Sequence, residues 1–134
     1  GRHDRVYRLY DTIVAFAPED IDARQQLVNL HILSGRRDAA IAEQRRIARI
    51  CNDQKNYPEA IGCFHQIIAL DPADADAYES LGDLLMKQKE FDQAVRLYKR
   101  LARLRPNDER VEALQAAAER MLAMTRGEGQ APRG

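Results

Sequence analysis

Apolar side chains recur three and four positions apart along most of the chain, the spacing that places them on one side of a helix. No segment alternates between apolar and polar residues as a half-buried strand does. Glycine and proline fall between the periodic segments and divide the chain at regular intervals. The pattern therefore predicts an all-α fold of helices joined by short turns.

Polar residues that can begin a helix follow three of the prolines by one or two positions. An Asp or Asn side chain accepts hydrogen bonds from the free backbone N–H groups of a first helical turn. The three candidate caps are Asp20, Asp74 and Asn107.

Two segments align without a gap, Ile41–Asp74 and Ala75–Asp108, at a spacing of about 34 residues. In each copy an alanine is followed by an aromatic residue, then an aliphatic residue, then a proline. The matched positions are Ala60, Phe64, Ile67 and Pro72 in the first copy and Ala94, Tyr98, Leu101 and Pro106 in the second. One hairpin of this size cannot bury its apolar side alone, so we expect the repeats to stack.

This repeat resembles the tetratricopeptide repeat, which reads W-x2-L-G-x2-Y, then A-x3-F, then P. In the fullest copy the family positions are held by Tyr78, Leu81, Gly82, Leu85, Ala94, Tyr98 and Pro106. Lys89 departs from the pattern, because it occupies the turn where glycine is usual, and a positive φ there costs about 1 kcal/mol. The resemblance implies stacked antiparallel hairpins in a right-handed superhelix of about seven helices.

We expect residues 1–124 to form one repeat domain: a half repeat over 1–20, repeats from 21 to 108, and a terminal helix over 109–124. The half repeat matches only a second helix, through Val6, Tyr10 and Ile13. Residues 125–134 contain Gly, Pro and polar residues, so they are expected to form a flexible tail.

The repeats that begin at Ile21 and Ile41 overlap, and both include residues 38–51. Either one helix is the second helix of one hairpin and the first of the next, or about one repeat of sequence is absent. A shared helix would bring Arg45 and Arg49 into the groove. Both alternatives predict an uncovered apolar surface, which favours homo-oligomer formation through the 38–70 junction or capture of a partner helix there.

Lysine plus arginine and aspartate plus glutamate each number 21, so no net charge favours nucleic acid or an anionic membrane. No apolar run approaches the roughly 20 residues of a membrane span, and residues 1–10 do not read as a signal peptide. Two cysteines favour a reducing compartment, so we expect a cytoplasmic protein. A basic helix face at Arg96, Lys99, Arg100 and Arg103 has no interleaved aromatic residues and is interpreted as solvated surface.

No catalytic or phosphate-binding motif occurs, so we expect neither an enzyme nor a bound cofactor. Zinc would accept Cys51, Cys63 and His65 as ligands, but Cys63 and His65 lie two apart on a predicted helix and point to different sides. His31 is expected to be a packed core histidine.

The resemblance implies that the first helices line a concave groove for a partner peptide or helix. The groove positions are Asp22, Gln25, Asn29, Asp76, Glu79, Asp83 and Met86. Chaperone-binding family members clamp a carboxylate at such positions, but only Asn29 matches them, and Asp76 and Asp83 would repel the ligand. We therefore expect a protein scaffold or adaptor whose partner carries basic residues. The alternative is a regulatory or substrate-docking array cut from a larger enzyme.

Overall fold

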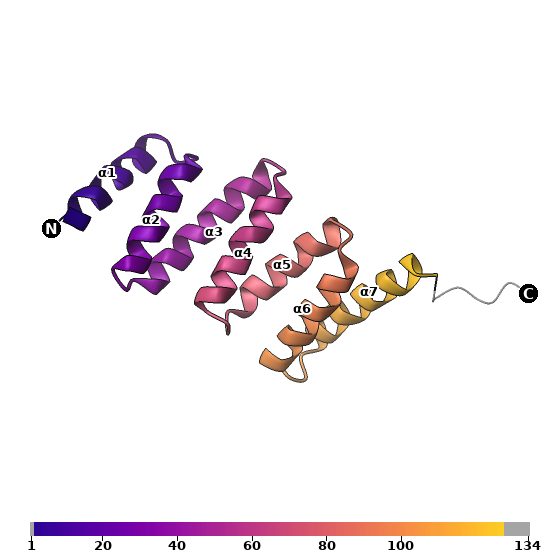
Figure 1. Ribbon diagram of the computed structural model, residues 1–134. Coiled ribbons are helices and arrows are strands. Elements are labelled where there is room, and N and C mark those ends of the chain that lie inside the picture. Colours follow the sequence, from indigo (N-terminus) through magenta and orange to yellow (C-terminus); the bar gives the residue numbers. More distant parts are fainter. Residues whose placement is uncertain (1, 128–134) are drawn as a thin grey trace, which may run out of the picture. The chain divides into compact units, whose positions relative to one another are not determined.

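The computed structural model describes residues 2–127, and within them the chain forms seven α-helices and no strand (Figure 1). The helices are α1 Arg2–Phe16, α2 Ile21–Leu33, α3 Arg37–Asp53, α4 Tyr57–Leu70, α5 Ala75–Lys87, α6 Phe91–Leu104 and α7 Glu109–Thr125. The all-α prediction is confirmed. Of the tail expected over 125–134, residues 128–134 lie outside the described residues, and Thr125 belongs to α7, which ends one residue later than predicted.

The chain divides into two compact units, Gly1–Pro72 with α1–α4 and Ala73–Gly134 with α5–α7. In the first unit α1 packs on α2, α2 on α3, and α3 on α4. In the second unit α6 packs on both α5 and α7. Neighbouring helices within each unit reverse direction at each turn, which gives antiparallel hairpins (Figure 1).

Three of the turns have the same three-residue geometry, in which the central residue has a positive φ. Gly35, Lys55 and Lys89 hold this position, with φ of 72°, 59° and 59°. The residue after each one donates a hydrogen bond to a carbonyl five residues earlier, as from Glu90 N to Leu85 O at 2.8 Å. The left-handed backbone expected at Lys89 is therefore confirmed, and Lys55 shares it.

The turns at both ends of α3 belong to this type, one centred on Gly35 and one on Lys55. In the family pattern such a turn joins the first helix of a hairpin to the second. Helix α3 is thus the second helix for α2 and the first helix for α4, and it packs against both. The overlapping repeats left two alternatives open, a helix shared by two hairpins or an absent repeat. The structure has one continuous helix over Arg37–Asp53, which is the shared helix. Ile47, which is 2 % exposed, falls on the core position of both patterns.

The other turns contain proline and end in an aspartate that begins the next helix. Asp20 Oδ1 accepts a hydrogen bond from Ala23 N at 3.0 Å, and Asp74 Oδ1 accepts one from Ala77 N at 3.1 Å. The prediction of Asn107 as the third cap is wrong. Asn107 has φ of 62°, and the next residue, Asp108, caps α7 instead.

A buried ion pair joins two helices of the first unit. Arg24 on α2 pairs with Glu43 on α3, and their side chains are 11 % and 6 % exposed. Arg24 Nε also donates to Pro18 O at 2.7 Å, and the more exposed Arg46 pairs with Glu43 at 2.9 Å. The Arg24 side chain of α2 therefore contacts both the α1–α2 turn and α3.

The exposed apolar surface expected at the 38–70 junction is not found. Within residues 2–127 the large exposed hydrophobic side chains lie elsewhere, at Leu9, Phe16, Ile32, Leu33, Leu104, Met121 and Met124. The shared helix explains the difference, because α3 covers α2 with one side and α4 with the other. Self-association through this junction therefore loses its physical basis.

Candidate functional site

The predicted groove positions of α2 lie on its exposed side. Asp22 and Asn29 are exposed and Gln25 is half-buried. Gln25 Nε2 donates to Asn29 Oδ1 at 3.5 Å, so the two amides are neighbours one turn apart. Sequence reasoning missed Ile32, which occupies the twelfth position of its repeat as Met86 does, and which is 46 % exposed. This face is polar with one apolar side chain at its end.

The corresponding face of α5 carries Asp76 and Asp83, which are exposed, and Glu79 and Met86, which are half-buried. The four residues follow helical spacing and so share one side of α5. Asp74 lies at the start of the helix but its side chain caps the backbone. Three carboxylates and one thioether therefore form a single stripe along α5.

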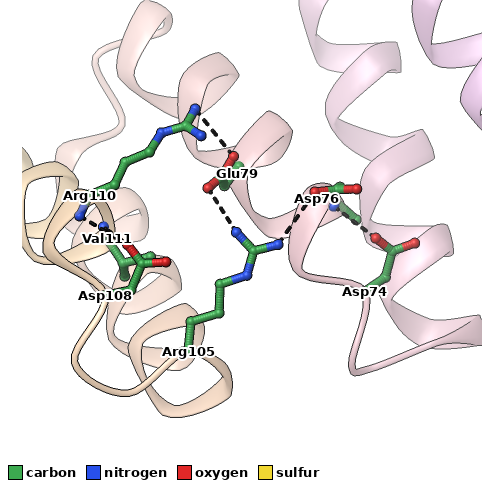
Figure 2. Close-up of polar contacts among 8 residues, drawn as sticks. Asp74, Asp76, Glu79, Arg105, Asp108, Arg110 and Val111 are labelled. Atoms are coloured by element: carbon green, nitrogen blue, oxygen red, sulfur yellow. Dashed lines mark hydrogen bonds and ion pairs between the residues drawn. The ribbon is translucent and has the colours of Figure 1, made fainter.

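Two arginines from the same unit reach this stripe, as Figure 2 shows. Arg105, in the turn before α7, lies 3.6 Å from Asp76 and 3.4 Å from Glu79. Arg110, in the first turn of α7, lies 3.5 Å from the other oxygen of Glu79. Asp108 accepts hydrogen bonds from Arg110 N and Val111 N and so caps the start of α7, and the Arg110–Glu79 pair joins this turn to α5 (Figure 2).

The ion pairs change the expected charge of the stripe. Two guanidinium groups offset the carboxylates of Asp76 and Glu79. Asp83 forms no ion pair with any residue between 2 and 127. The sequence showed the carboxylates but not their partners, because Arg105 and Arg110 lie 26 and 31 residues beyond Glu79. The negative charge left for a ligand is thus centred on Asp83, next to Met86.

A tyrosine lies directly beneath this stripe. Tyr98 of α6 is 1 % exposed and passes against Gly82, where a methyl group would come within 2.5 Å of its ring and hydroxyl oxygen. Its hydroxyl has no hydrogen-bond partner within the described part of the chain. Burial, with smaller contributions from the carboxylates of Asp83 and Glu79, raises the pKa of Tyr98 to about 12. The hydroxyl therefore stays neutral and serves packing.

The shared helix α3 presents Arg45 and Arg49 on its less buried side. Arg49 is exposed and Arg45 is half-buried, whereas Ala48 and Cys51 on the other side are 1 % and 2 % exposed. Both arginines therefore lie where a first helix presents its groove positions. The first unit presents basic residues here, whereas the charged residues of the stripe on α5 are acidic.

The basic residues of α6 are exposed, but one of them has a structural contact. Arg100 donates to the Tyr78 hydroxyl at 3.1 Å, and its guanidinium carbon lies 5.2 Å from the centre of the Tyr78 ring. This contact joins α5 to α6, so Arg100 has a structural role on the basic face.

The cysteines and histidines lie apart from these faces. Cys51 and Cys63 are buried and free, and burial raises the pKa of Cys63 to about 12. His65 is exposed while Cys63 is buried, so the two point to different sides as predicted. No group of three or more His, Cys, Asp and Glu residues between 2 and 127 is arranged to hold a metal ion. His31 is 7 % exposed and meets Tyr7 edge-on, with ring centres 5.3 Å apart.

The model of the tetratricopeptide repeat matches residues 52–118, which is half of the chain. The chain belongs to the tetratricopeptide repeat family. The match begins at the end of α3, so it includes the regular hairpin α5–α6 and leaves out the irregular first half. No curated protein matches the sequence.

Solved structures of tetratricopeptide proteins share this fold at low sequence identity. The C-terminal TPR-containing domain of a putative FK506-binding protein from Plasmodium falciparum is 17% identical, with 93% of this chain and 91% of that chain covered and a TM-score of 0.63. The first TPR of Spaghetti bound to an HSP90 peptide is 18% identical, with 77% and 95% covered and a TM-score of 0.52. YrrB, a TPR protein with an unusual peptide-binding site, is 10% identical, with 96% and 72% covered and a TM-score of 0.53.

None of the helices between residues 2 and 127 has both the length and the apolar character that crossing a membrane requires.

Proposed function

We propose that this tetratricopeptide chain is a protein-interaction scaffold that takes no catalytic part itself and binds a partner peptide or helix along the groove faces of its first helices. The observation that carries the proposal is the stripe on α5, where charged and apolar side chains stay exposed or half-buried at the groove positions of the family. The HSP90 peptide bound to the first TPR of Spaghetti and the peptide-binding site of YrrB support a peptide or protein ligand as a class.

The partner carries a lysine or arginine next to an apolar residue. Its cation pairs with Asp83, whose carboxylate forms no ion pair with the described residues 2–127, and its apolar side chain packs on Met86, one turn further along α5. Asp76 and Glu79 contribute less, because Arg105 and Arg110 already offset their charge. On the first unit by itself, Asp22, Gln25 and Asn29 offer hydrogen bonds to a partner segment on α2.

The proposal is tested with Asp83→Lys, measured by fluorescence polarisation against a library of short peptides that pair Lys or Arg with an apolar residue. Peptides that bind the parent chain are expected to lose at least about tenfold in affinity, since a lost charge pair and a new repulsion together exceed 1.4 kcal/mol. Asp53→Lys is the matched control, because it reverses the charge of an exposed aspartate on a different helix, α3.

Binding to the parent chain should weaken with added salt, because the pair at Asp83 is exposed to solvent. Replacing the basic residue of the peptide by glutamine should abolish the difference between the parent and Asp83→Lys. If Asp83→Lys and Asp53→Lys bind the library equally well, the α5 stripe is not the peptide site.

A further inference from the structure

The three hairpins with a positive-φ turn differ in the residue that begins their second helix. That residue is Arg37 on α3, Tyr57 on α4 and Phe91 on α6, in each case two positions after the positive-φ residue. Phe91 is 6 % exposed and Tyr57 is half-buried, whereas Arg37 is exposed. Two hairpins thus bury an aromatic side chain, wholly or in part, at this position, and the hairpin of α2 and α3 has none there.

The backbone of the turn places this position beside the end of the first helix. The hydrogen bond from Glu90 N to Leu85 O, at 2.8 Å, brings Phe91 next to the last turn of α5. The matching bond, from Arg36 N to His31 O at 2.7 Å, gives the α2–α3 turn the same geometry. An aromatic side chain at the start of α3 would therefore lie beside the last turn of α2.

The end of α2 exposes apolar side chains where the other first helices do not. Leu30 is half-buried, whereas Leu84, at the same position of α5, is 4 % exposed. Leu33 is 71 % exposed, and its matches on α3 and α5 are the charged residues Asp53 and Lys87. Leu30 and Leu33 lie three positions apart, so they share one side of α2.

The exposure of Leu33 follows from its place in the hairpin and not from where the chain begins. Asp53 and Lys87 are exposed as well, although other helices precede both of them in the chain. This position faces solvent in all three hairpins, and only the α2–α3 hairpin has an apolar residue there.

Two arginines follow these leucines. Arg36 and Arg37 are both exposed, whereas the residue that matches Arg36 in the α5–α6 turn is Glu90. The guanidinium carbon of Arg36 lies 5.9 Å from the centre of the Tyr7 ring, and Arg37 forms no ion pair with any residue between 2 and 127. Asp38 is the one carboxylate of the segment 30–38. The turn therefore has a net positive charge next to two apolar side chains.

We propose that this turn surface, made of Leu30, Leu33, Arg36 and Arg37, binds an aromatic side chain of a partner peptide that has carboxylates on either side of it. The ring lies over the two leucines, in the place that Phe91 takes in its own hairpin. The flanking carboxylates pair with the two guanidinium groups. An aromatic occupant fits because it is the kind of side chain with which the other two hairpins fill the same position.

The turn surface differs from the stripe on α5 in both place and charge. It lies on the first unit and calls for an acidic aromatic segment, whereas the stripe calls for a basic one. The inference does not rest on the proposed function, and peptides of opposite charge test the two surfaces separately.

Fluorescence polarisation on the whole chain tests the proposal with short labelled peptides that each have one phenylalanine, tyrosine or tryptophan between glutamates or aspartates. Leu33→Lys gives α2 the residue type that α5 has, and it should weaken binding at least about tenfold without changing helicity by circular dichroism. Phe16→Lys is the matched control and should bind like the parent, because Phe16 is 87 % exposed at the far end of α1. Replacing the aromatic residue of a peptide by alanine, or its acids by lysine, should abolish binding.

A second variant supplies the ring from the chain itself. Arg37→Tyr places at the start of α3 the residue type that begins α4 at Tyr57. It should raise the urea midpoint, because the ring covers exposed leucines, and it should block the peptides from the same place. Arg37→Gln removes the same charge without adding a ring, so it should leave the midpoint unchanged and weaken binding less.

Equal binding of the peptides by Leu33→Lys and Phe16→Lys overturns the proposal, and so does a parent chain that binds none of them. An Arg37→Tyr midpoint no higher than that of Arg37→Gln overturns it too, since the surface then does not hold a ring. Binding to phosphatidylserine vesicles that depends on Leu33, with no peptide bound, assigns the surface to a membrane and equally overturns the proposal.

Discussion

Replacing Gly82 by alanine places a methyl group where Tyr98 already lies. The added carbon would come within 2.5 Å of three Tyr98 atoms, the ring carbons Cε1 and Cζ and the hydroxyl oxygen. Ordinary contacts are about 1 Å longer, so the ring or the helix must move. The same substitution at Gly62 on α4 meets nothing within 4 Å, and Gly62 is exposed. The two glycines therefore form a matched pair in which only the space differs.

The two substitutions should change stability in opposite directions. Alanine in place of glycine inside a helix stabilises by about 0.5–1 kcal/mol, and this contribution is common to both sites. At Gly82 overpacking opposes it by about 1–3 kcal/mol. The upper part of that range applies, because Tyr98 is 1 % exposed and cannot swing into solvent. We expect Gly62→Ala to gain about 0.5–1 kcal/mol and Gly82→Ala to lose about 1–2 kcal/mol.

Urea unfolding followed by circular dichroism gives the two free energies, and hydrogen exchange of the α5 and α6 amides locates the loss in the second unit. Combining Gly82→Ala with Tyr98→Leu should remove most of the penalty, because the smaller side chain leaves room for the methyl group. Equal or greater stability of Gly82→Ala, with the α5 amides protected as in the parent, would refute the packing argument.

Three further predictions concern the first unit and the turns. Burial, and next the charge of Arg36, lower the pKa of His31 below its ordinary value of about 6.5. The unfolded chain then binds the proton more readily, so stability should fall as pH drops below about 6.5, and His31→Gln should flatten that dependence in urea titrations. Glu43→Ala leaves Arg24 buried without its carboxylate and should cost about 3–5 kcal/mol in urea unfolding. Arg46→Ala removes only the exposed partner of Glu43 and should cost under about 1 kcal/mol. Lys89→Gly relieves a positive φ and should raise the unfolding free energy by about 1 kcal/mol; no gain would mean that the turn holds lysine without strain.

Much of the fold follows from local sequence. Helix positions follow from apolar spacing, and the turn at Lys89 follows from its alignment with glycine positions of the family. Gly82 was expected to let helices approach closely, and the structure shows that its missing side chain leaves room for the Tyr98 ring. These features depend on residues of a single hairpin, which lie within one repeat of each other in the sequence.

Other features depend on contacts that sequence spacing does not show. The ion pairs of Arg105 with Asp76 and Glu79 join a turn to a helix start nearly one repeat away. Their presence moved the free negative charge of the candidate site to Asp83. The cap of α7 was misplaced by one residue, because Asn and Asp are both good caps and only the backbone conformation at Asn107 separates them.

The double role of α3 amounts to a phase shift within the array. The positive-φ turns at Lys55 and Lys89 are 34 residues apart, the period of a two-helix repeat, but those at Gly35 and Lys55 are only 20 apart. Only helix α3 lies between the turns at Gly35 and Lys55, whereas two helices lie between the turns at Lys55 and Lys89. A search at a single fixed period therefore aligns only one side of α3 at a time. An array built in this way can lengthen or shorten by one helix, and each such step exchanges which helices come first and which come second in a hairpin.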